Sequence, residues 1–545
     1  MKKLPIGIAN FKDIIEEGYY YVDKTQVIER LLKEGPASVI FTRPRRFGKT
    51  LTLNMLKCFF EDTEQLNIPS RQHLFHGLYI QASEYFKEQG RYPVIYLSFK
   101  DCRPDTWEEC LENLKEVVQN EYERHAYAFE DNKGEYDGIK NDTITLTKWQ
   151  SSLSNLAKHL KSYHQQKCII IIDEYDVPLR EAHINGFYNQ AIKFIKNLFS
   201  RALKDNTENV KMSIISGCLR ISKESMFTGW NNAVLYTITG SGYTDIFGLT
   251  DAEVQEMLKY YDMIKEYNTV REWYNGYTFN KTQIYNTWEV LNFIQAKIND
   301  STYQPCSYWV NTIIQDVLDL NDNQVREDLE KLLQNETITK PITDYLNYGN
   351  LKKEKENLWS ILLHSGYLTT VSKQLNGEYE LKIPNRSIRQ CFIEEINLYF
   401  KQVVEKSLAE QMDKCFIEND AQSLNYVLNL FLQSTLSYYD DLESFYHGLV
   451  VGLCGGLNHK YNIQSNKEKG DGRADLVLSS KQEFNTVIIL EFKFEDNPNN
   501  LAKKAQEALK QIDDKNYGAL PLLQGAKPQK FGIAFNKKQC VVVGK

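Results

Sequence analysis

The sequence predicts an α/β protein with a parallel sheet flanked by helices at its N-terminal end, a mainly helical middle, and a smaller α/β domain at its C-terminal end. In the first half, short apolar runs alternate with helical patterns, which is typical of a parallel sheet. A mainly helical, Trp/Tyr-rich pattern follows, and the last part contains strands bounded by glycine and flanked by helices. We therefore expect domains at residues 1–248, 249–435 and 436–545.

The composition is that of an ordinary globular protein with more than one domain. Its 545 residues exceed what one hydrophobic core usually supports. Hydrophobic residues make up 42% and charged residues 25%, and the net charge is −7. This charge excludes a uniformly basic nucleic-acid coat but allows a local basic groove. The ten cysteines include no C-x-x-C pair, which argues against a zinc ribbon and favours reduced thiols.

Neither a signal peptide nor a membrane-spanning segment is expected. Two lysines follow the first methionine, but acidic and basic residues interrupt the sequence soon after Phe11 and no apolar segment develops. The chain also lacks a run of about 18 uncharged apolar residues. We expect a cytoplasmic protein without a membrane partner, and the sequence leaves its oligomeric state open.

The order of predicted elements in the first half is strand, helix, strand, helix. We expect strands at 37–42, 93–99, 168–172 and 210–216, and helices at 49–60, 107–125 and 187–204. Residues 131–146 are rich in Asp, Asn, Gly and Lys, and we expect them to form a loop or an insertion.

A Gly48-Lys49-Thr50 turn between the first strand and the first helix predicts a phosphate-binding loop. Backbone N–H groups there offer partial positive charge to phosphates. Lys49 is expected to reach the β- and γ-phosphates, and the Thr50 hydroxyl to bind Mg²⁺. Arg43 stands where such loops begin with glycine, and Pro44 lacks an N–H donor. The residues expected to bind the nucleotide here are Arg45, Arg46, Phe47, Gly48, Lys49 and Thr50.

A second half of the nucleotide site is expected where the apolar run 169–172 ends in Asp173 and Glu174. Asp173 is expected to hold Mg²⁺ and Glu174 to polarise the attacking water. The alternative is a buried strand that ends in a solvated acidic turn. Residues 210–216 are expected to form the adjacent strand. Arg220, beyond its end, is expected to contact a γ-phosphate or to form a surface ion pair.

Two strands near the C-terminus predict a second site with paired carboxylates. Asp475 opens one strand, and Glu491 and Lys493 lie in the other. Because side chains of a strand alternate between faces, Glu491 and Lys493 share one face. If the strands pair, Asp475 can approach Glu491. Two carboxylates supply oxygen ligands for Mg²⁺ or Mn²⁺, and Lys493 can position or polarise a water molecule.

Flanking helices are expected to complete this second site. Glu443, on a helical stretch at 442–453, is expected to join the metal ligands. A helix at 501–513 carries Gln506 and Gln511, which can hydrogen-bond near the site or to a phosphate. The alternative for the Glu-x-Lys pattern is an amphipathic hairpin whose Glu and Lys pair in solvent.

Several sequence motifs along the chain carry a family resemblance. They are Tyr21-Val22-Asp23-Lys24-Thr25, Arg43-Pro44-Arg45-Arg46-Phe47-Gly48-Lys49-Thr50, Asp173-Glu174-Tyr175-Asp176, Gly217-x-x-Arg220, Phe247-Gly248-Leu249-Thr250, Trp273-Tyr274-Asn275-Gly276-Tyr277, Tyr285-Asn286-Thr287-Trp288, Ser365-Gly366-Tyr367-Leu368-Thr369, Ile383-Pro384-Asn385-Arg386, Gly472-Arg473-Ala474-Asp475 and Glu491-Phe492-Lys493. With them the chain resembles a prokaryotic family that joins an AAA-ATPase-like domain to a C-terminal PD-(D/E)XK nuclease-like domain. The resemblance implies a P-loop NTPase fold with a catalytic Glu after the metal-binding Asp, and a restriction-endonuclease-like C-terminal domain. The family itself carries Arg at the position of Arg43.

The leading hypothesis is an ATP-binding P-loop NTPase coupled to a Mg²⁺- or Mn²⁺-dependent nuclease that acts on nucleic acid. One alternative is an NTP-dependent switch whose nuclease-like domain only binds a partner or nucleic acid. Another is a nuclease-like domain attached to a loop that binds nucleotide without turnover. The Trp/Tyr motifs between residues 273 and 288 are expected to pack a helical lid or linker, or else to stack on a nucleotide or on DNA.

Overall fold

A computed structural model of the chain describes residues 1–204, 206–219, 233–309, 323–333, 335–344, 356–399, 405–434, 450, 454, 457, 460–469, 472–481, 487–495, 497–514, 528–536 and 539–545. By its internal contacts the chain divides into two compact units. The first unit is Met1–Thr312 with Thr337–Cys391, and the second is Ile313–Glu336 with Phe392–Lys545. The three-part division expected from the sequence stays a prediction.

The first unit contains a sheet of five parallel strands in the order β2-β3-β4-β1-β5. These strands are β1 (Ser38–Thr42), β2 (Val94–Ser98), β3 (Cys168–Asp173), β4 (Val210–Gly217) and β5 (Ala233–Tyr236). Every residue of β1 and β3 is buried, as expected for strands of a parallel sheet that is covered on both faces. The predicted parallel sheet is therefore confirmed. Because β4 lies between β3 and β1, the carboxyl ends of these three strands are neighbours.

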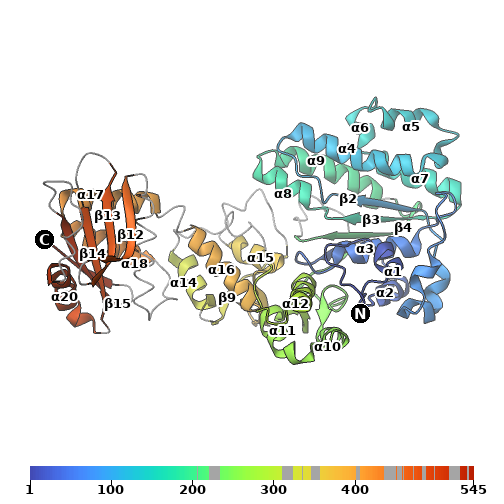
Figure 1. The fold of residues 1–545 in the computed structure, drawn as a ribbon. Coiled ribbons are helices and arrows are strands. Elements are labelled where there is room, and N and C mark those ends of the chain that lie inside the picture. Colours follow the sequence, from blue (N-terminus) through green and yellow to red (C-terminus); the bar gives the residue numbers. More distant parts are fainter. Residues whose placement is uncertain are drawn as a thin grey trace. The chain divides into compact units, whose positions relative to one another are not determined.

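Helices cover both faces of this sheet, with α1, α2 and α3 on one face and α4, α7, α8 and α9 on the other (Figure 1). The helices are α1 (Phe11–Glu16), α2 (Gln26–Glu34), α3 (Lys49–Phe60), α4 (Trp107–Arg124), α5 (Lys133–Lys140), α6 (Leu146–Trp149), α7 (Ser152–His164), α8 (Val177–Ile184) and α9 (Tyr188–Phe199). The predicted helix 49–60 is confirmed. Residues 131–146, expected as a loop or an insertion, contain α5. Its Gly138 and Ile139 are buried, so tertiary packing overrides a locally loop-like composition.

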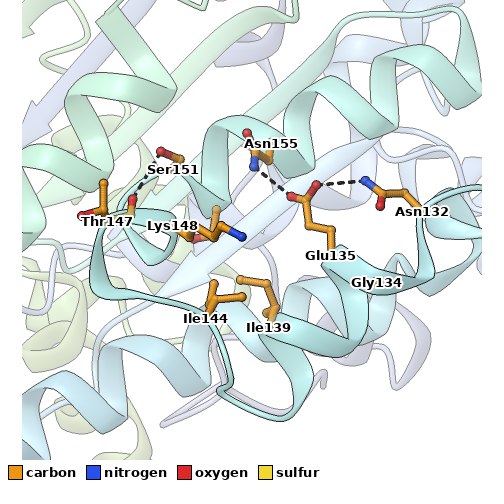
Figure 2. Close-up of a pocket in the computed structure, with 10 residues that line it drawn as sticks. Asn132, Gly134, Glu135, Ile139, Ile144, Thr147, Lys148, Ser151 and Asn155 are labelled. Carbon is orange, nitrogen blue, oxygen red and sulfur yellow. Dashed lines mark hydrogen bonds between the residues drawn. The ribbon is translucent and has the colours of Figure 1, made fainter.

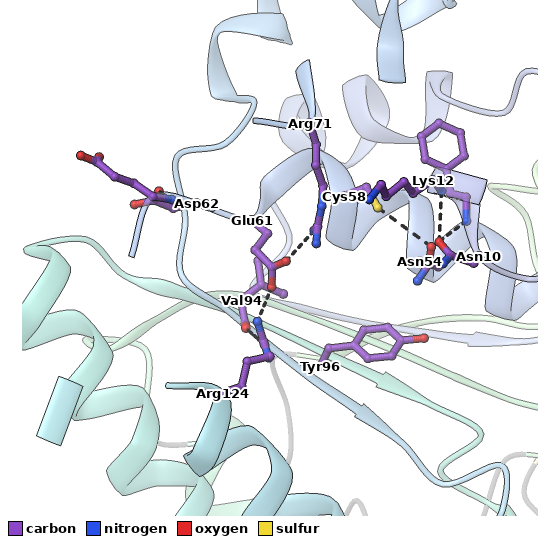
Figure 3. A network of polar contacts seen from close by, with 12 residues as sticks. Asn10, Lys12, Asn54, Cys58, Glu61, Asp62, Arg71, Val94, Tyr96 and Arg124 are labelled. Carbon is purple, nitrogen blue, oxygen red and sulfur yellow. Dashed lines mark hydrogen bonds and ion pairs between the residues drawn. The ribbon is translucent and has the colours of Figure 1, made fainter. Parts of the chain in front are cut away.

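At the C-terminal end of α3, the buried carboxylate of Glu61 forms ion pairs with two arginines (Figure 3). The Glu61 side chain is fully buried, and its two oxygens lie 2.5 Å from the guanidinium groups of Arg71 and Arg124. Arg124 of α4 also donates a hydrogen bond to the Val94 carbonyl of β2. Removing one partner of a buried ion pair typically costs about 3–5 kcal/mol. This network therefore holds α3, the helix that follows the predicted phosphate-binding loop, against β2 and α4.

The rest of the first unit is mainly helical, as predicted, and adds two small sheets of three strands each. Its helices are α10 (Asp251–Tyr260), α11 (Tyr267–Tyr274), α12 (Thr287–Asn299), α15 (Glu356–Ser365) and the start of α16 (Arg386–Tyr399). The sheets are β6-β8-β7 (Leu249–Thr250, Thr282–Tyr285, Tyr277–Phe279) and β10-β11-β9 (Thr369–Lys373, Tyr379–Lys382, Ile338–Lys340). A two-residue turn joins β7 to β8, with Asn280 in the left-handed conformation at φ 55° that such turns favour.

The second unit contains a mixed sheet in the order β12-β13-β14-β15-β16, in which only β14 and β15 are parallel. Its elements are α14 (Asn323–Leu333), α17 (Glu405–Glu418), α18 (Ala421–Ser434), β12 (Tyr461–Lys469), β13 (Gly472–Ser480), β14 (Val487–Phe494), α20 (Leu501–Asp514), β15 (Gln529–Asn536) and β16 (Gln539–Gly544). Helices α17 and α18 cover one face of the sheet. Helix α20 connects β14 to β15 and packs on the other face. The predicted C-terminal α/β domain is therefore confirmed.

Within the described parts of the chain, no helix is both long and apolar enough to cross a membrane.

Candidate functional site

The loop between β1 and α3, the predicted phosphate-binding loop, contains two residues in the left-handed conformation. Gly48 precedes α3 with φ 79°, and Arg46 also adopts a left-handed conformation with φ 69°. Among the described residues, no side chain caps the N-terminus of α3. The first N–H groups of a helix have no partner within the helix, so an anion can accept their hydrogen bonds. The loop therefore presents an uncapped helix end directly after the strand.

Lys49 folds back over this loop. It is 5% exposed, and its Nζ lies 3.0 Å from the Arg43 carbonyl oxygen and 2.9 Å from that of Pro44. The same Nζ is 3.4 Å from Cys218 Sγ at the end of β4. The predicted phosphate-binding ammonium thus lies inside the loop. Thr50, the predicted Mg²⁺ ligand, is the second residue of α3 and is partly exposed.

Asp173 ends β3 as a fully buried carboxylate. Ser216 of β4 donates a hydrogen bond of 2.6 Å to its Oδ1, whereas its Oδ2 accepts none from any residue that the structure describes. Two further buried side-chain oxygens, in Thr42 and Ser98, also lack a partner among these residues. They end β1 and β2, and Ser98 pairs with Asp173 in register. A buried carboxylate oxygen without a donor fits a divalent cation such as Mg²⁺.

Glu174 follows Asp173 in a strained backbone conformation, with φ 52°. A left-handed residue other than glycine costs on the order of 1 kcal/mol and is typical of functional sites. Burial raises the pKa of Glu174. Asp173 and Asp176 add to the rise, and the positive charges of Lys49 and Arg45 oppose it. The structure therefore brings Lys49, Arg45, Asp173 and Glu174 into one electrostatic cluster.

Tyr175 and Asp176 connect this cluster to the end of β4. The Asp176 carboxylate accepts hydrogen bonds from the N–H groups of Cys218 and Leu219, at 3.1 and 3.0 Å. The Tyr175 hydroxyl donates to the Leu219 carbonyl at 2.7 Å. A Cβ at Gly217 would lie 2.6 Å from both Asp176 Oδ1 and the Tyr175 ring, so glycine permits this close approach. Arg220, the predicted γ-phosphate contact, lies outside the described residues.

Two of the loop arginines, Arg43 and Arg45, have different surroundings. Arg43 is fully buried, and its guanidinium donates to the carbonyl groups of Tyr236 and Tyr243. Burial lowers its pKa to about 9, so it stays charged at neutral pH. Burial also lowers the pKa of Arg45, but nearby Cys218, Asp176 and Glu174 more than offset that effect. Arg45 therefore lies near the acidic residues that follow β3, and Arg43 lies in the protein core.

The motif at residues 21–25 has a structural role. Lys24 Nζ lies 2.7 Å from both carboxylate oxygens of Glu253 and 2.7 Å from the Asp245 carbonyl oxygen. Asp23 accepts hydrogen bonds from the N–H groups of Thr25 and Tyr79. The contacts of Lys24 join the N-terminal segment to residues 245–253, and the contact between Asp23 and Tyr79 joins it to the segment around residue 79.

In the second unit, strand pairing brings the predicted carboxylates together. β13 and β14 are antiparallel with Leu476 opposite Leu490, so Asp475 and Glu491 are the next residues in register. The Asp475 N–H lies 3.4 Å from Glu491 Oε2, and Asp475 Oδ2 accepts a 2.8 Å hydrogen bond from the Phe492 N–H. Glu491 is 2% exposed. Lys493, two residues later in β14, lies on the same face of the strand as Glu491 and is half-buried.

Helix α20 closes over this face of the sheet. Gln511 donates a hydrogen bond to Glu491 Oε1, as the sequence suggested for this helix. Gly532 of β15 lies beside Glu491 in register. A Cβ at Gly532 would lie 2.3 Å from the Ala505 carbonyl oxygen of α20. Glycine at this position lets the helix approach the sheet closely enough for Gln511 to reach the carboxylate.

The third predicted ligand, Glu443, lies outside the described residues. In the described part of the chain, no group of three or more His, Cys, Asp or Glu side chains could hold a metal ion. The described donor set at the C-terminal site is therefore Asp475 with Glu491. Carboxylate oxygens are the ligand type that Mg²⁺ and Mn²⁺ prefer, so these two residues fit such an ion as part of a larger set.

Two regions of the chain match known protein families. Residues 5–227 match the family model described as "Predicted AAA-ATPase". Residues 441–545 match the model of the PD-(D/E)XK nuclease superfamily. The chain joins an AAA-ATPase-like region to a PD-(D/E)XK nuclease superfamily region. The predicted resemblance is thereby confirmed. A similar protein, described as "Uncharacterized protein in vnfD 5'region" from Azotobacter chroococcum mcd 1, is 25% identical over 561 residues, covering 100% of this chain and 98% of that protein.

The AAA-ATPase-like region also has a pocket of about 500 Å³ between α5, α6 and α7 (Figure 2). Its lining contains none of the predicted site residues. The central carboxylate, Glu135, already accepts hydrogen bonds from Asn155 at 2.8 Å and from Asn132 at 3.1 Å. His159 lies 3.2 Å from the same carboxylate. The contacts of Glu135 with Asn132, Asn155 and His159 stabilise the insertion between α4 and α7.

Asp176 and Cys218 lie beside the predicted nucleotide site, but their local sequence carries too little signal to identify them. Asp176 is the last residue of the Asp-Glu-Tyr-Asp motif, and its spacing alone does not show that it caps the N–H groups beyond β4. Cys218 lies two residues after Ser216, and only the pairing of β4 with β1 brings it to Lys49. The position of Cys218 just past a predicted strand end was the available signal.

Proposed function

We propose that this protein binds ATP with Mg²⁺ in its AAA-ATPase-like region, hydrolyses it, and thereby controls metal-dependent cleavage of nucleic acid by its nuclease-superfamily region. The observation that carries the proposal is Asp173, a buried carboxylate with one oxygen free of donors among the described residues. It ends β3 beside Glu174, whose pKa is raised by burial while the nearby positive charge of Lys49 opposes the rise. Burying a carboxylate that lacks a hydrogen-bond donor costs free energy, and a cation bound to its oxygen would offset that cost.

Each residue of the nucleotide site then has a role. The uncapped N-terminus of α3 and the ammonium of Lys49 bind the phosphates. Asp173 and Thr50 would hold Mg²⁺, which would neutralise phosphate charge. Glu174 orients the attacking water and accepts its proton, and a raised pKa brings this base closer to neutral pH. Arg45 supplies positive charge on the same side of the loop.

In the nuclease-superfamily region, Asp475 and Glu491 would hold a divalent metal, with Glu443 as the further ligand that the sequence predicts. Such a metal would act as a Lewis acid and activate a bound water. Lys493, on the same strand face as Glu491, would position that water. The hydrogen bond from Gln511 keeps Glu491 oriented in its buried position. None of the ten cysteines, all within the described residues, forms a disulfide, which supports a reducing compartment, and we propose that the protein is cytoplasmic.

Purified full-length protein tests this proposal with plasmid, linear and single-stranded substrates, each with and without Mn²⁺ and ATP. We expect Mg–ATP binding by calorimetry, phosphate release, and cleavage that needs the divalent ion and responds to ATP. ATP binding without any cleavage would instead favour an NTP-dependent switch whose nuclease-like region binds a partner. A protein that binds no nucleotide would refute the proposal for the N-terminal site.

A further inference from the structure

The C-terminal end of β4 lies between the two halves of the predicted nucleotide site. β4 pairs with β1 on one side and with β3 on the other. The Gly217 carbonyl accepts a 3.1 Å hydrogen bond from the Arg43 N–H, in the loop that follows β1. The Ser216 carbonyl accepts one of 3.2 Å from the Tyr175 N–H, in the turn that follows β3. Residues 216–219, here called the β4 end segment, are therefore bonded to both halves.

Two side-chain contacts join this segment to residues with predicted roles in nucleotide binding. Cys218 Sγ lies 3.4 Å from Lys49 Nζ. Ser216 Oγ donates a 2.6 Å hydrogen bond to Asp173 Oδ1. The ammonium expected at the phosphates and the carboxylate expected at Mg²⁺ thus both contact the β4 end segment. A displacement of the segment would therefore disturb both groups, and small displacements of binding groups are costly.

Asp176 holds the β4 end segment in place. Its carboxylate is buried and accepts hydrogen bonds from the N–H groups of Cys218 and Leu219, at 3.1 and 3.0 Å. Both N–H groups lie beyond Gly217, the last residue of β4, so they are not part of the strand pairing. A Cβ at Gly217 would lie 2.6 Å from Asp176 Oδ1, which shows how closely the carboxylate packs against the segment that it binds.

The place of Asp176 in the chain adds a second argument. It is the N-cap residue of α8, a position at which an aspartate side chain usually accepts an N–H group of the first helical turn. Its side chain makes no such bond to the described residues of α8. The carboxylate is instead directed to the β4 end segment, so its contacts serve the nucleotide side of the sheet and not its own helix.

The later residues of the predicted phosphate-binding loop are fixed by other contacts. The Phe47 ring packs edge-on against Tyr277, with centroids 4.9 Å apart. The Phe47 carbonyl accepts a 2.9 Å hydrogen bond from the Gly248 N–H. The Arg46 guanidinium donates a hydrogen bond to the Tyr308 carbonyl. A substitution of the carboxylate that holds the β4 end segment leaves these contacts intact, so we expect the rest of the loop to keep its structure.

We propose that Asp176 is a positioning residue of the nucleotide site: through the N–H groups of Cys218 and Leu219 it fixes the β4 end segment, and the segment places Cys218 against Lys49. The inference rests on the proposed nucleotide binding. With the segment fixed, the ammonium is held at the loop before the phosphates arrive, so less side-chain freedom is lost on binding. Without Asp176, the same ammonium must be ordered at the moment of binding, and the affinity falls.

Calorimetric titration of the full chain with Mg–ATP compares two substitutions of Asp176 with a matched control. Asp176→Ala removes both acceptor oxygens, whereas Asp176→Asn keeps the size of the side chain and one acceptor oxygen but loses the charge. We expect the affinity to fall about tenfold in the first variant and about threefold in the second. Asp420 is the control, because its Oδ1 accepts 3.0 Å hydrogen bonds from two successive N–H groups, those of Gln422 and Ser423, in the second unit. Asp420→Ala should bind Mg–ATP like the wild type.

A double-mutant cycle shows whether Asp176 acts through the Cys218 side chain. Cys218→Ala removes the contact of Sγ with Lys49 and leaves the Asp176 carboxylate in place. Both substitutions break the same chain of contacts, so the double variant should bind Mg–ATP no more weakly than Asp176→Ala alone. Additive losses of affinity would contradict the inference, because they would show that Asp176 acts by another route.

Thiol alkylation measures the β4 end segment directly, without nucleotide. Of the ten cysteines, all of them described, Cys218 and Cys306 are partly exposed and the others are buried. Brief treatment with iodoacetamide, followed by mass spectrometry of peptides, gives a rate for each thiol. We expect Cys218 to react about tenfold faster in Asp176→Ala than in the wild type, because the segment that carries it opens locally. The rate at Cys306 should not change, and unlabelled buried cysteines show that the variant is folded.

The outcomes separate this inference from the proposed function. The inference is overturned if the wild type binds Mg–ATP and Asp176→Ala binds it equally well, or if Cys218 reacts at the same rate in both proteins. Should Asp176→Ala expose its buried cysteines to the reagent, Asp176→Asn replaces it in both measurements, and wild-type values for that variant overturn the inference in the same way. A wild type that binds no ATP would refute the proposed function itself.

Discussion

Replacing Lys49 with Ala is the sharpest test of the nucleotide site. In the structure the ammonium group lies within 3.0 Å of two loop carbonyl oxygens, and residues 43–48 of the sequence contain no other lysine. Backbone N–H groups cannot replace this full charge beside the phosphates. Truncating one partner of a desolvated charge pair costs about 2–4 kcal/mol. That cost corresponds to a roughly 30- to 900-fold weaker affinity for ATP.

Calorimetric titration with Mg–ATP measures this loss directly, and ligand-induced stabilisation gives an independent value. At a nucleotide concentration of about 100 times the wild-type Kd, binding stabilises the folded protein by about 2.7 kcal/mol. If Kd rises about 100-fold, the same concentration provides only about 0.4 kcal/mol. The shift in the thermal transition should therefore nearly vanish in Lys49→Ala.

The variant also removes the donor from the Arg43 and Pro44 carbonyl groups, so a small loss of stability without nucleotide is expected, about 1–3 kcal/mol. Lys33→Ala is the control, since Lys33 is an exposed residue of α2 in the same unit. It should leave both the affinity and the stability unchanged. Equal ATP affinity for the wild type and Lys49→Ala would refute the interpretation of residues 43–50 as a phosphate-binding loop.

Three further sets of substitutions have distinct outcomes. Glu174→Gln should bind ATP with near wild-type affinity but release phosphate far more slowly, because the amide keeps the shape and loses the base; unchanged turnover would make Glu174 structural. Asp475→Ala and Glu491→Ala should abolish Mg²⁺- or Mn²⁺-dependent cleavage while ATP binding persists, and chelation should do the same to the wild type. Lys493→Ala should slow cleavage but retain the metal; cleavage that survives both carboxylate substitutions would indicate another site. Gly532→Ala places a methyl group 2.3 Å from a backbone oxygen of α20 and should destabilise the second unit by about 1–3 kcal/mol, measured as a lower denaturation midpoint; an unchanged midpoint would contradict the close packing.

Local sequence patterns were enough to predict features that depend on neighbouring residues. The helix predicted at 49–60 has the same bounds as α3. The Gly-Lys-Thr turn that begins it and the apolar periodicity along it can both be recognised from neighbouring residues alone. The apolar run before Asp173 predicted β3 for the same reason. Alternation along β14 predicted that Glu491 and Lys493 share a face, since the period of a strand is two.

Contacts between residues far apart in the sequence could be identified only from the tertiary structure. Nothing near Arg43 in sequence shows that its charge lies between Phe247 and Phe279 instead of beside phosphates. The small sheets of the middle part also escaped prediction, because short strands of about two to five residues carry little periodicity. Gln511 reaches Glu491 only because Gly532 admits α20 to the sheet. Such contacts depend on packing between segments far apart in the chain, and no local pattern encodes the fit of one surface to another.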